Sequence, residues 1–126
     1  AFGPNHRNTM IAMSNLAGVW SDRGDYEKAE RLVREVIDIM GTVLGENHPN
    51  TLVTRANLGE VLNHLGEFQE SEAMLKDVIE KLQGKLQRNH PAFIFCMKTL
   101  ATSLEKQGKK AESDQIILEI NKLTRK

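Results

Sequence analysis

The sequence is poor in the residues that mark disulfide-stabilised or membrane-spanning chains. Its 126 residues include one cysteine, Cys96, which excludes an internal disulfide and favours a reducing, cytoplasmic location. No apolar run approaches the roughly 18 residues that a membrane-spanning helix needs, so no membrane partner is expected. Charged residues make up 27% and hydrophobic residues 40% of the chain, which indicates a soluble folded protein and not a disordered one.

The chain also lacks a net charge, because 17 basic residues balance 17 acidic ones. The basic and acidic residues number 5 and 6 in residues 1–42, 3 and 7 in residues 43–84, and 9 and 4 in residues 85–126. The basic last third is either a surface for an acidic partner or an ordinary solvated face. A pI near 7.1 and an aromatic content of 5% argue against nucleic-acid binding.

A period of 42 residues runs through the whole chain. The residues that recur at this spacing are His6, His48 and His90, then Gly24, Gly66 and Gly108, then Leu16, Leu58 and Leu100. We therefore divide the chain into three repeats, at residues 1–42, 43–84 and 85–126, which together form one domain over 1–126. Because the chain begins with Ala1 and not with Met, we expect this domain to be a fragment of a longer protein.

Each period contains two amphipathic helical patterns separated by a glycine. In the second repeat Pro49 suits the first turn of a helix, and Gly66 suits the left-handed turn that ends it. A second apolar stripe follows from Phe68 to Leu82. The patterns predict helices over 8–22, 26–42, 50–65, 68–84, 92–106 and 110–124.

Small residues recur where the two helices of a repeat must lie close together. Ala17, Gly59 and Ala101 share one register position, and helices joined by so short a turn pack at about 8–10 Å. One hairpin cannot bury both of its apolar faces, so the leucines at the preceding position are expected to enter a core shared by stacked repeats. On the last helix, the face with Ile117, Ile120 and Leu123 either lies open, or meets a further repeat or another molecule.

The pair Leu58-Gly59, with Gly66 and Phe68 after it, resembles the tetratricopeptide signature. The linker over 44–51, LGENHPNT, is similar to the long repeats of kinesin light chain. It also resembles repeat arrays in fungal and bacterial nucleotide-binding (STAND-type) signalling proteins. The resemblance implies an all-α, right-handed superhelical solenoid of three helix–turn–helix repeats and six helices. It further implies a non-catalytic scaffold that needs no cofactor and binds a protein or peptide ligand.

In such repeats the first helix of each pair lines a concave groove, and position-by-position transfer gives the candidate binding residues. They are Asn15, Gly18, Asp22, Asn57, Glu60, Asn63, His64, Lys98, Thr102 and Lys106. Helical spacing independently places the four candidates of the second repeat on one polar face. The amides of Asn15 and Asn57 offer a donor and an acceptor to a peptide unit, or they bond a neighbouring helix instead.

Other functions are less well supported by the residues. His6, His48 and His90 lie one repeat apart, so we expect structural roles in the linkers and no metal site. Glu60 and His64 are spaced for acid–base work, but an exposed helix pair explains them better. Cys96 is expected to pack as a small apolar residue. The remaining alternative is a structural element without a separate ligand, which acts through self-assembly or through packing within its own protein. In either case the chain is expected to be a monomer or to associate weakly end to end.

Overall fold

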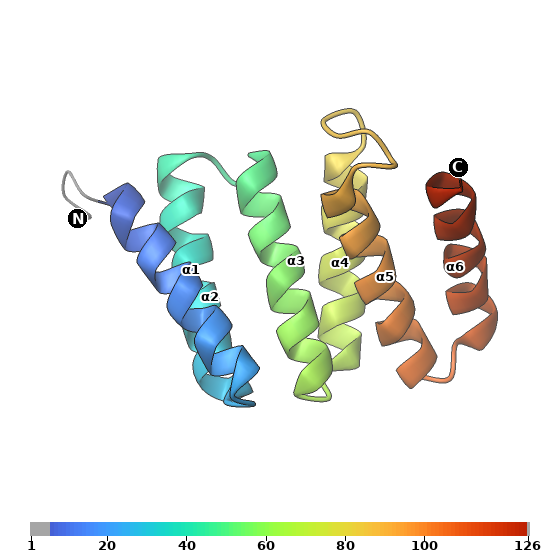
Figure 1. Cartoon of the computed structure of the whole chain (residues 1–126), viewed down its shortest axis with the longest axis horizontal. Helices are drawn as coiled ribbons and strands as arrows, with labels where there is room; N and C mark the ends of the chain where they lie inside the picture. The colour runs from blue at the N-terminus through green and yellow to red at the C-terminus, as the bar shows by residue number, and fades with distance from the viewer. Residues whose placement is uncertain (1–5, 126) are drawn as a thin grey trace.

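The structure is a computed structural model that describes residues 6–125, and these residues form a ribbon of stacked helical hairpins. The helices are α1 (His6–Asp22), α2 (Tyr26–Val43), α3 (Pro49–His64), α4 (Phe68–Leu82), α5 (Pro91–Lys106) and α6 (Lys110–Thr124). Figure 1 shows them following one another along the ribbon in chain order, with α1 and α6 at its opposite ends. The prediction of an all-α array of three hairpins is confirmed.

The helix bounds follow the predicted ones closely, and the largest differences are of two residues, at the start of α1 and at the end of α4. This helix ends at Leu82, two residues before the predicted end. Gln83 takes an extended backbone and Gly84 has a φ of 86°, so the chain turns away from the helix there. Gly66, which ends the preceding helix, likewise has a φ of 82°, a left-handed backbone that residues with a Cβ rarely adopt.

Two of the recurring histidines begin helices. The Nδ1 atom of His48 accepts a hydrogen bond from the backbone N–H of Asn50 at 3.0 Å, and His90 does the same for Ala92. Each histidine thus supplies the acceptor that serine or aspartate usually gives to the free N–H groups of a first turn. The structural role predicted for these two histidines is confirmed, whereas the side chain of His6 lies outside the described residues.

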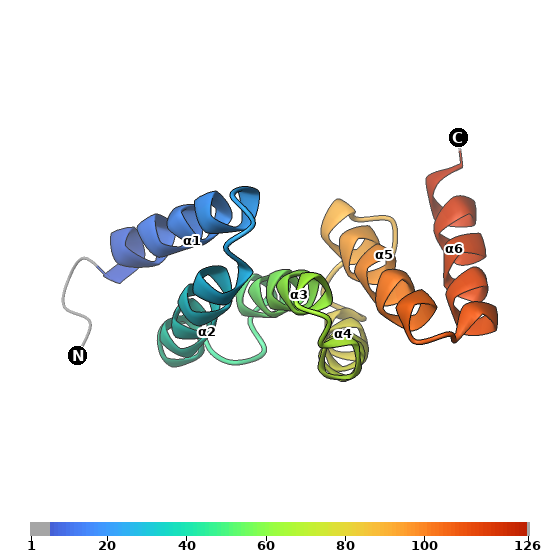
Figure 2. The same cartoon turned by 90° about the horizontal axis from the view of Figure 1, so that it is seen from below.

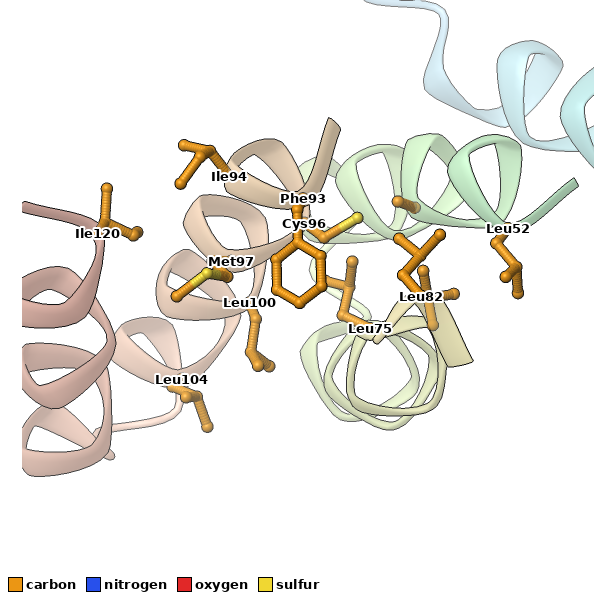
Figure 3. Packing of buried hydrophobic residues seen from close by; sticks show 12 residues of the cluster. Leu52, Leu75, Leu82, Phe93, Ile94, Cys96, Met97, Leu100, Leu104 and Ile120 are labelled. Carbon is orange, nitrogen blue, oxygen red and sulfur yellow. The ribbon is translucent and has the colours of Figure 1, made fainter. Parts of the chain in front are cut away.

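The larger of the two hydrophobic clusters lies between the second and third repeats. Phe93 of α5 is fully buried at its centre, and Figure 3 shows its ring among Leu75, Leu82 and Cys96. Burial raises the pKa of the Cys96 thiol to about 11, so the thiol stays protonated at neutral pH. The prediction that Cys96 packs as an apolar residue is confirmed.

The first and second repeats share a smaller cluster, which contains Ala17, Val33, Leu58 and Leu62. Here α3 packs against α2 and α5, whereas α1 packs chiefly against α2 (Figure 2). The prediction that Leu16 belongs to the core is wrong, since 43% of its surface is exposed. Its counterparts in the later repeats face the second helix of the repeat before them, and within residues 6–125 no such helix lies beside α1.

Candidate functional site

A pocket of about 470 Å³ lies between α1 and α3, with α2 beneath it. We call it the α1–α3 pocket, and its lining comes from all three helices. The lining residues are Ser14, Ala17, Gly18, Ser21, Asp22, Tyr26, Val33, Val36, Thr54, Asn57, Glu60, Val61 and His64. Its volume falls within the range of about 300–1,000 Å³ that is usual for ligand pockets.

Small side chains on α1 keep the pocket open. Ser14, Ala17, Gly18 and Ser21 follow one another at helical spacing along the face of α1 that lines the pocket. A Cβ atom added to Gly18 would meet no atom within 4 Å, so this part of α1 borders empty space. The hollow is therefore a consequence of side-chain size on α1 as well as of the way α1 leans away from α3.

The pocket combines an apolar base with polar groups that have no partner in the chain. Val33 and Val36 of α2 are buried, and Asp22, Asn57 and Glu60 are exposed. Within residues 6–125 the side chain of Asn57 makes no hydrogen bond, and neither carboxylate forms an ion pair. These three side chains are free to bind groups of another molecule.

His64 does not pair with Glu60. Its ring stacks on that of Tyr26 with a centroid distance of 4.4 Å and an interplanar angle of 2°. The stack joins the end of α3 to the start of α2, and both residues line the pocket. Glu60 and His64 are thus exposed on one face of α3, as predicted, but no ion pair or hydrogen bond within residues 6–125 joins them, and the imidazole contacts Tyr26 instead.

The structure gathers only half of the candidate residues around this pocket. Gly18, Asp22, Asn57, Glu60 and His64 line it. Asn15 lines a separate hollow near the start of α1, together with Arg7, Met40 and Asn50. Its side chain, like that of Asn57, makes no hydrogen bond in the part of the chain that the structure describes.

The other four candidates lie on the side of the third repeat. Asn63 donates from Nδ2 to the backbone oxygen of Thr99 at 3.1 Å, so it joins α3 to α5. Lys98, Thr102 and Lys106 are exposed on α5, and none of them reaches the α1–α3 pocket. The ten candidate residues are thus divided among the α1–α3 pocket, the hollow beside Asn15 and the side of the third repeat.

Sequence reasoning missed the contribution of α2 to the pocket. The pocket is lined from α2 by Tyr26, Val33 and Val36. Apolar residues at helical spacing indicate a core, but they do not show where that core is left uncovered. Thr54 of α3 was also missed, although it lies one turn before Asn57 on the same face. That spacing is the one signal that could have identified it.

The family model for the tetratricopeptide repeat matches residues 9–84, which is more than half of the chain. The chain belongs to the tetratricopeptide repeat family. No curated protein matches the sequence. As members of this family typically do, the chain has a scaffold fold suited to protein–protein contacts.

Among solved structures, the repeat fold is shared with a protein of Podosopora anserina that has nearly identical TPR-like repeats and has been ascribed to kinesin light chain. A single-residue variant of that protein gives a TM-score of 0.78 at 21% identity over 95% of this chain, and a second structure gives 0.76 at 21% over 98%. The present chain spans 55% and 59% of the lengths of those two chains. At this identity the likeness shows the fold alone.

No helix of residues 6–125 is long and apolar enough to cross a membrane. In the same range, no group of three or more histidine, cysteine, aspartate or glutamate side chains is placed to hold a metal ion.

Proposed function

We propose that this chain is a non-catalytic scaffold that binds a peptide or protein segment along α1, α3 and α5. The α1–α3 pocket is the main binding site for that segment. The supporting observation is the pocket itself, whose buried valines lie beside polar groups without partners. The amide of Asn57 has the donor and acceptor that an extended peptide backbone requires. The buried thiol of Cys96 fits the reducing compartment, the cytoplasm, that we propose for the protein.

Selection from a random peptide library, displayed on phage and presented to the whole chain, tests this proposal. Peptides that use the pocket should lose about tenfold in affinity when Asn57→Ala removes a pair of hydrogen bonds. They should lose more when Gly18→Leu fills the hollow. Gln115→Ala, at an exposed position of α6 far along the chain, is the control. Circular dichroism confirms that each variant keeps its helices, and peptides indifferent to both pocket variants would contradict the proposal.

End-to-end association is the second candidate, favoured by the exposed apolar residues at the two ends. Leu16 and Val19 of α1 are 43% and 44% exposed, and Ile117 of α6 is 40% exposed. Ile117 occupies the register position of Leu75, which is fully buried in the second repeat. The two ends thus present the surfaces that stack inside the array, although Ile120, expected on the open face, is buried.

Sedimentation velocity over a wide concentration range separates the two candidates. If the molecular mass remains that of a single chain at every concentration, only the peptide-binding scaffold is supported. A mass that rises with concentration, and returns to one chain in the Ile117→Glu variant, supports head-to-tail association, because such a contact does not close on itself and continues into filaments.

A further inference from the structure

The charges around the α1–α3 pocket are all of one sign. Asp22 and Glu60 contribute carboxylates to its lining, which contains no lysine or arginine. Neither carboxylate forms an ion pair within residues 6–125. The only basic side chain in the lining is His64, and its ring is stacked on Tyr26.

The cations of the neighbouring helices are engaged elsewhere. Lys28 and Arg23 lie over the ring of Trp20, at 4.3 Å and 5.9 Å from its centroid. Arg34 pairs with Glu30 and Glu70, and Arg55 pairs with Asp77. Arg7 and Arg31 line other hollows of the chain. No lysine or arginine of these helices therefore lines the pocket, and a bound molecule is the natural source of positive charge.

The shape of the pocket suits a long cationic side chain. Its base is apolar, with Ala17, Val33 and Val36 buried, while both carboxylates are exposed to water. Lysine and arginine bury their methylene stems against apolar surface and keep the charged head in a polar layer. An arginine head in addition offers five donors in a plane, which match carboxylate oxygens.

The third repeat lacks this charge pattern. Thr102 and Lys106 of α5 occupy the register positions of Glu60 and His64, and Lys98 is exposed on the same helix. At these register positions the first helices thus change from carboxylates, Asp22 on α1 and Glu60 on α3, to a hydroxyl and an ammonium group on α5. A peptide that lies along these helices meets a preference for positive charge at one end only.

We infer that the α1–α3 pocket selects a lysine or arginine side chain of an extended peptide segment, held by Asp22 and Glu60. This inference rests on the proposed function and adds the chemical class of the bound residue. The carboxylates act as a specificity element, and Asn57 bonds the peptide backbone beside them. Charge pairs of this kind set partner choice more than they set overall affinity.

The test is random-peptide selection on the whole chain, repeated on a double variant with Asp22→Asn and Glu60→Gln. Both substitutions keep the side-chain shape and remove the charge. The matched control carries Glu35→Gln and Glu80→Gln, which change the net charge equally at exposed positions of the second helices, outside the pocket. We expect peptides selected on the unmodified chain and on the control to share one position rich in lysine or arginine. Their affinity should fall about tenfold or more on the double variant.

The outcomes separate this inference from the proposed function. If selected peptides depend on Asn57 and Gly18 but carry acidic or apolar residues, or bind the double variant equally well, the cation preference is wrong and the scaffold function stands. A library that yields no peptide dependent on the pocket overturns both. Replacing the shared basic residue of a selected peptide by glutamine should abolish its sensitivity to the double variant, and persistence of that sensitivity would also contradict the inference.

Discussion

The two junctions between repeats use the same 42-residue register but are built differently. At the second junction the aromatic ring of Phe93 fills the space between α3, α4 and α5 (Figure 3). Its register counterpart at the first junction is Thr51, whose hydroxyl is turned to the backbone oxygen of Gly45 at 2.9 Å. One junction is therefore packed around a large apolar residue, while the other leaves the α1–α3 pocket unfilled.

Polar contacts made by the first helices follow the same division, whereas an ion pair between Arg34 and Glu70 joins the second helices across the first junction. Across the second junction Asn63 bonds Thr99, Ser103 donates to the backbone oxygen of Phe68 at 2.7 Å, and Gln107 donates to Glu72 at 2.8 Å. The counterparts of these three donors at the first junction are Ser21, Val61 and Leu65. Two of them have no side-chain donor, and the serine is shorter. The comparison shows that the same repeat pattern can give two repeats joined by many side-chain contacts and, next to them, two repeats that leave a pocket open between their first helices.

Alanine substitution at a shared register position gives the largest expected difference between the junctions. Leu100 is 5% exposed and Leu16 is 43% exposed. Leu100→Ala leaves a cavity in the second junction and should lower the free energy of unfolding by about 2–5 kcal/mol. Leu16→Ala removes a side chain that is already half in water, so it should cost less than about 1 kcal/mol. Urea unfolding followed by circular dichroism measures both, and equal losses would contradict the comparison.

Two glycines of the first helices give the next largest contrast. A Cβ on Gly59 would lie 3.0 Å from Cγ of Leu75, whereas a Cβ on Gly18 would meet nothing within 4 Å. Gly59→Ala should therefore destabilise the chain by about 1–3 kcal/mol through overpacking. Gly18→Ala should stabilise it by about 0.4–1 kcal/mol, because alanine favours the helix and the space is empty.

Thermal unfolding of the two glycine variants gives their order directly. The unmodified chain should melt between them. A Gly18→Ala variant that melts below the unmodified chain would show that α1 lies closer to α3 than the pocket implies.

The repeat register accounts for most of what the sequence predicts about the fold. His48 and His90 are 42 residues apart, and so are successive turn glycines. This period gives the number of helices and nearly all their bounds. The polar face of α3 likewise places Asn57 and Glu60 at the pocket. These features are local, because each depends on residues within one hairpin.

What the sequence leaves undetermined is how closely each hairpin approaches the next. The register treats Leu16 and Leu100 alike, and only the packing of whole helices shows that one is exposed and the other buried. Asn63 was predicted to line the groove because helical spacing places it on the same polar face as Asn57. In the structure its side chain instead donates a hydrogen bond to the backbone oxygen of Thr99. Such contacts depend on the neighbouring repeat, so periodicity within one repeat does not reveal them.

The smallest expected effect concerns a carboxylate at the second junction. Hydrogen bonds from Lys76, then Lys109 and Gln107, lower the pKa of Glu72 from 4.5 to about 2. Its register counterpart, Glu30, pairs with Arg34 of its own helix. The positions that correspond to Gln107 and Lys109 are Leu65 and Glu67, which offer Glu30 no donor. Glu72 is therefore expected to link two repeats, and Glu30 is not.

Because the folded-state pKa of Glu72 is depressed, its stabilisation is fully present above about pH 4.5 and is lost as the pH falls toward 2. Its lysine partners are exposed, so we expect Glu72→Gln to cost only about 1 kcal/mol at pH 7. Glu30→Gln, the matched control, should cost about 0.5 kcal/mol or less. Urea unfolding at a series of pH values should show the Glu72→Gln difference shrinking below pH 4.5. If the difference in the free energy of unfolding does not change with pH, Glu72 acts through its packing and not through its charge. The second junction would then be stabilised by Phe93 and its apolar neighbours alone.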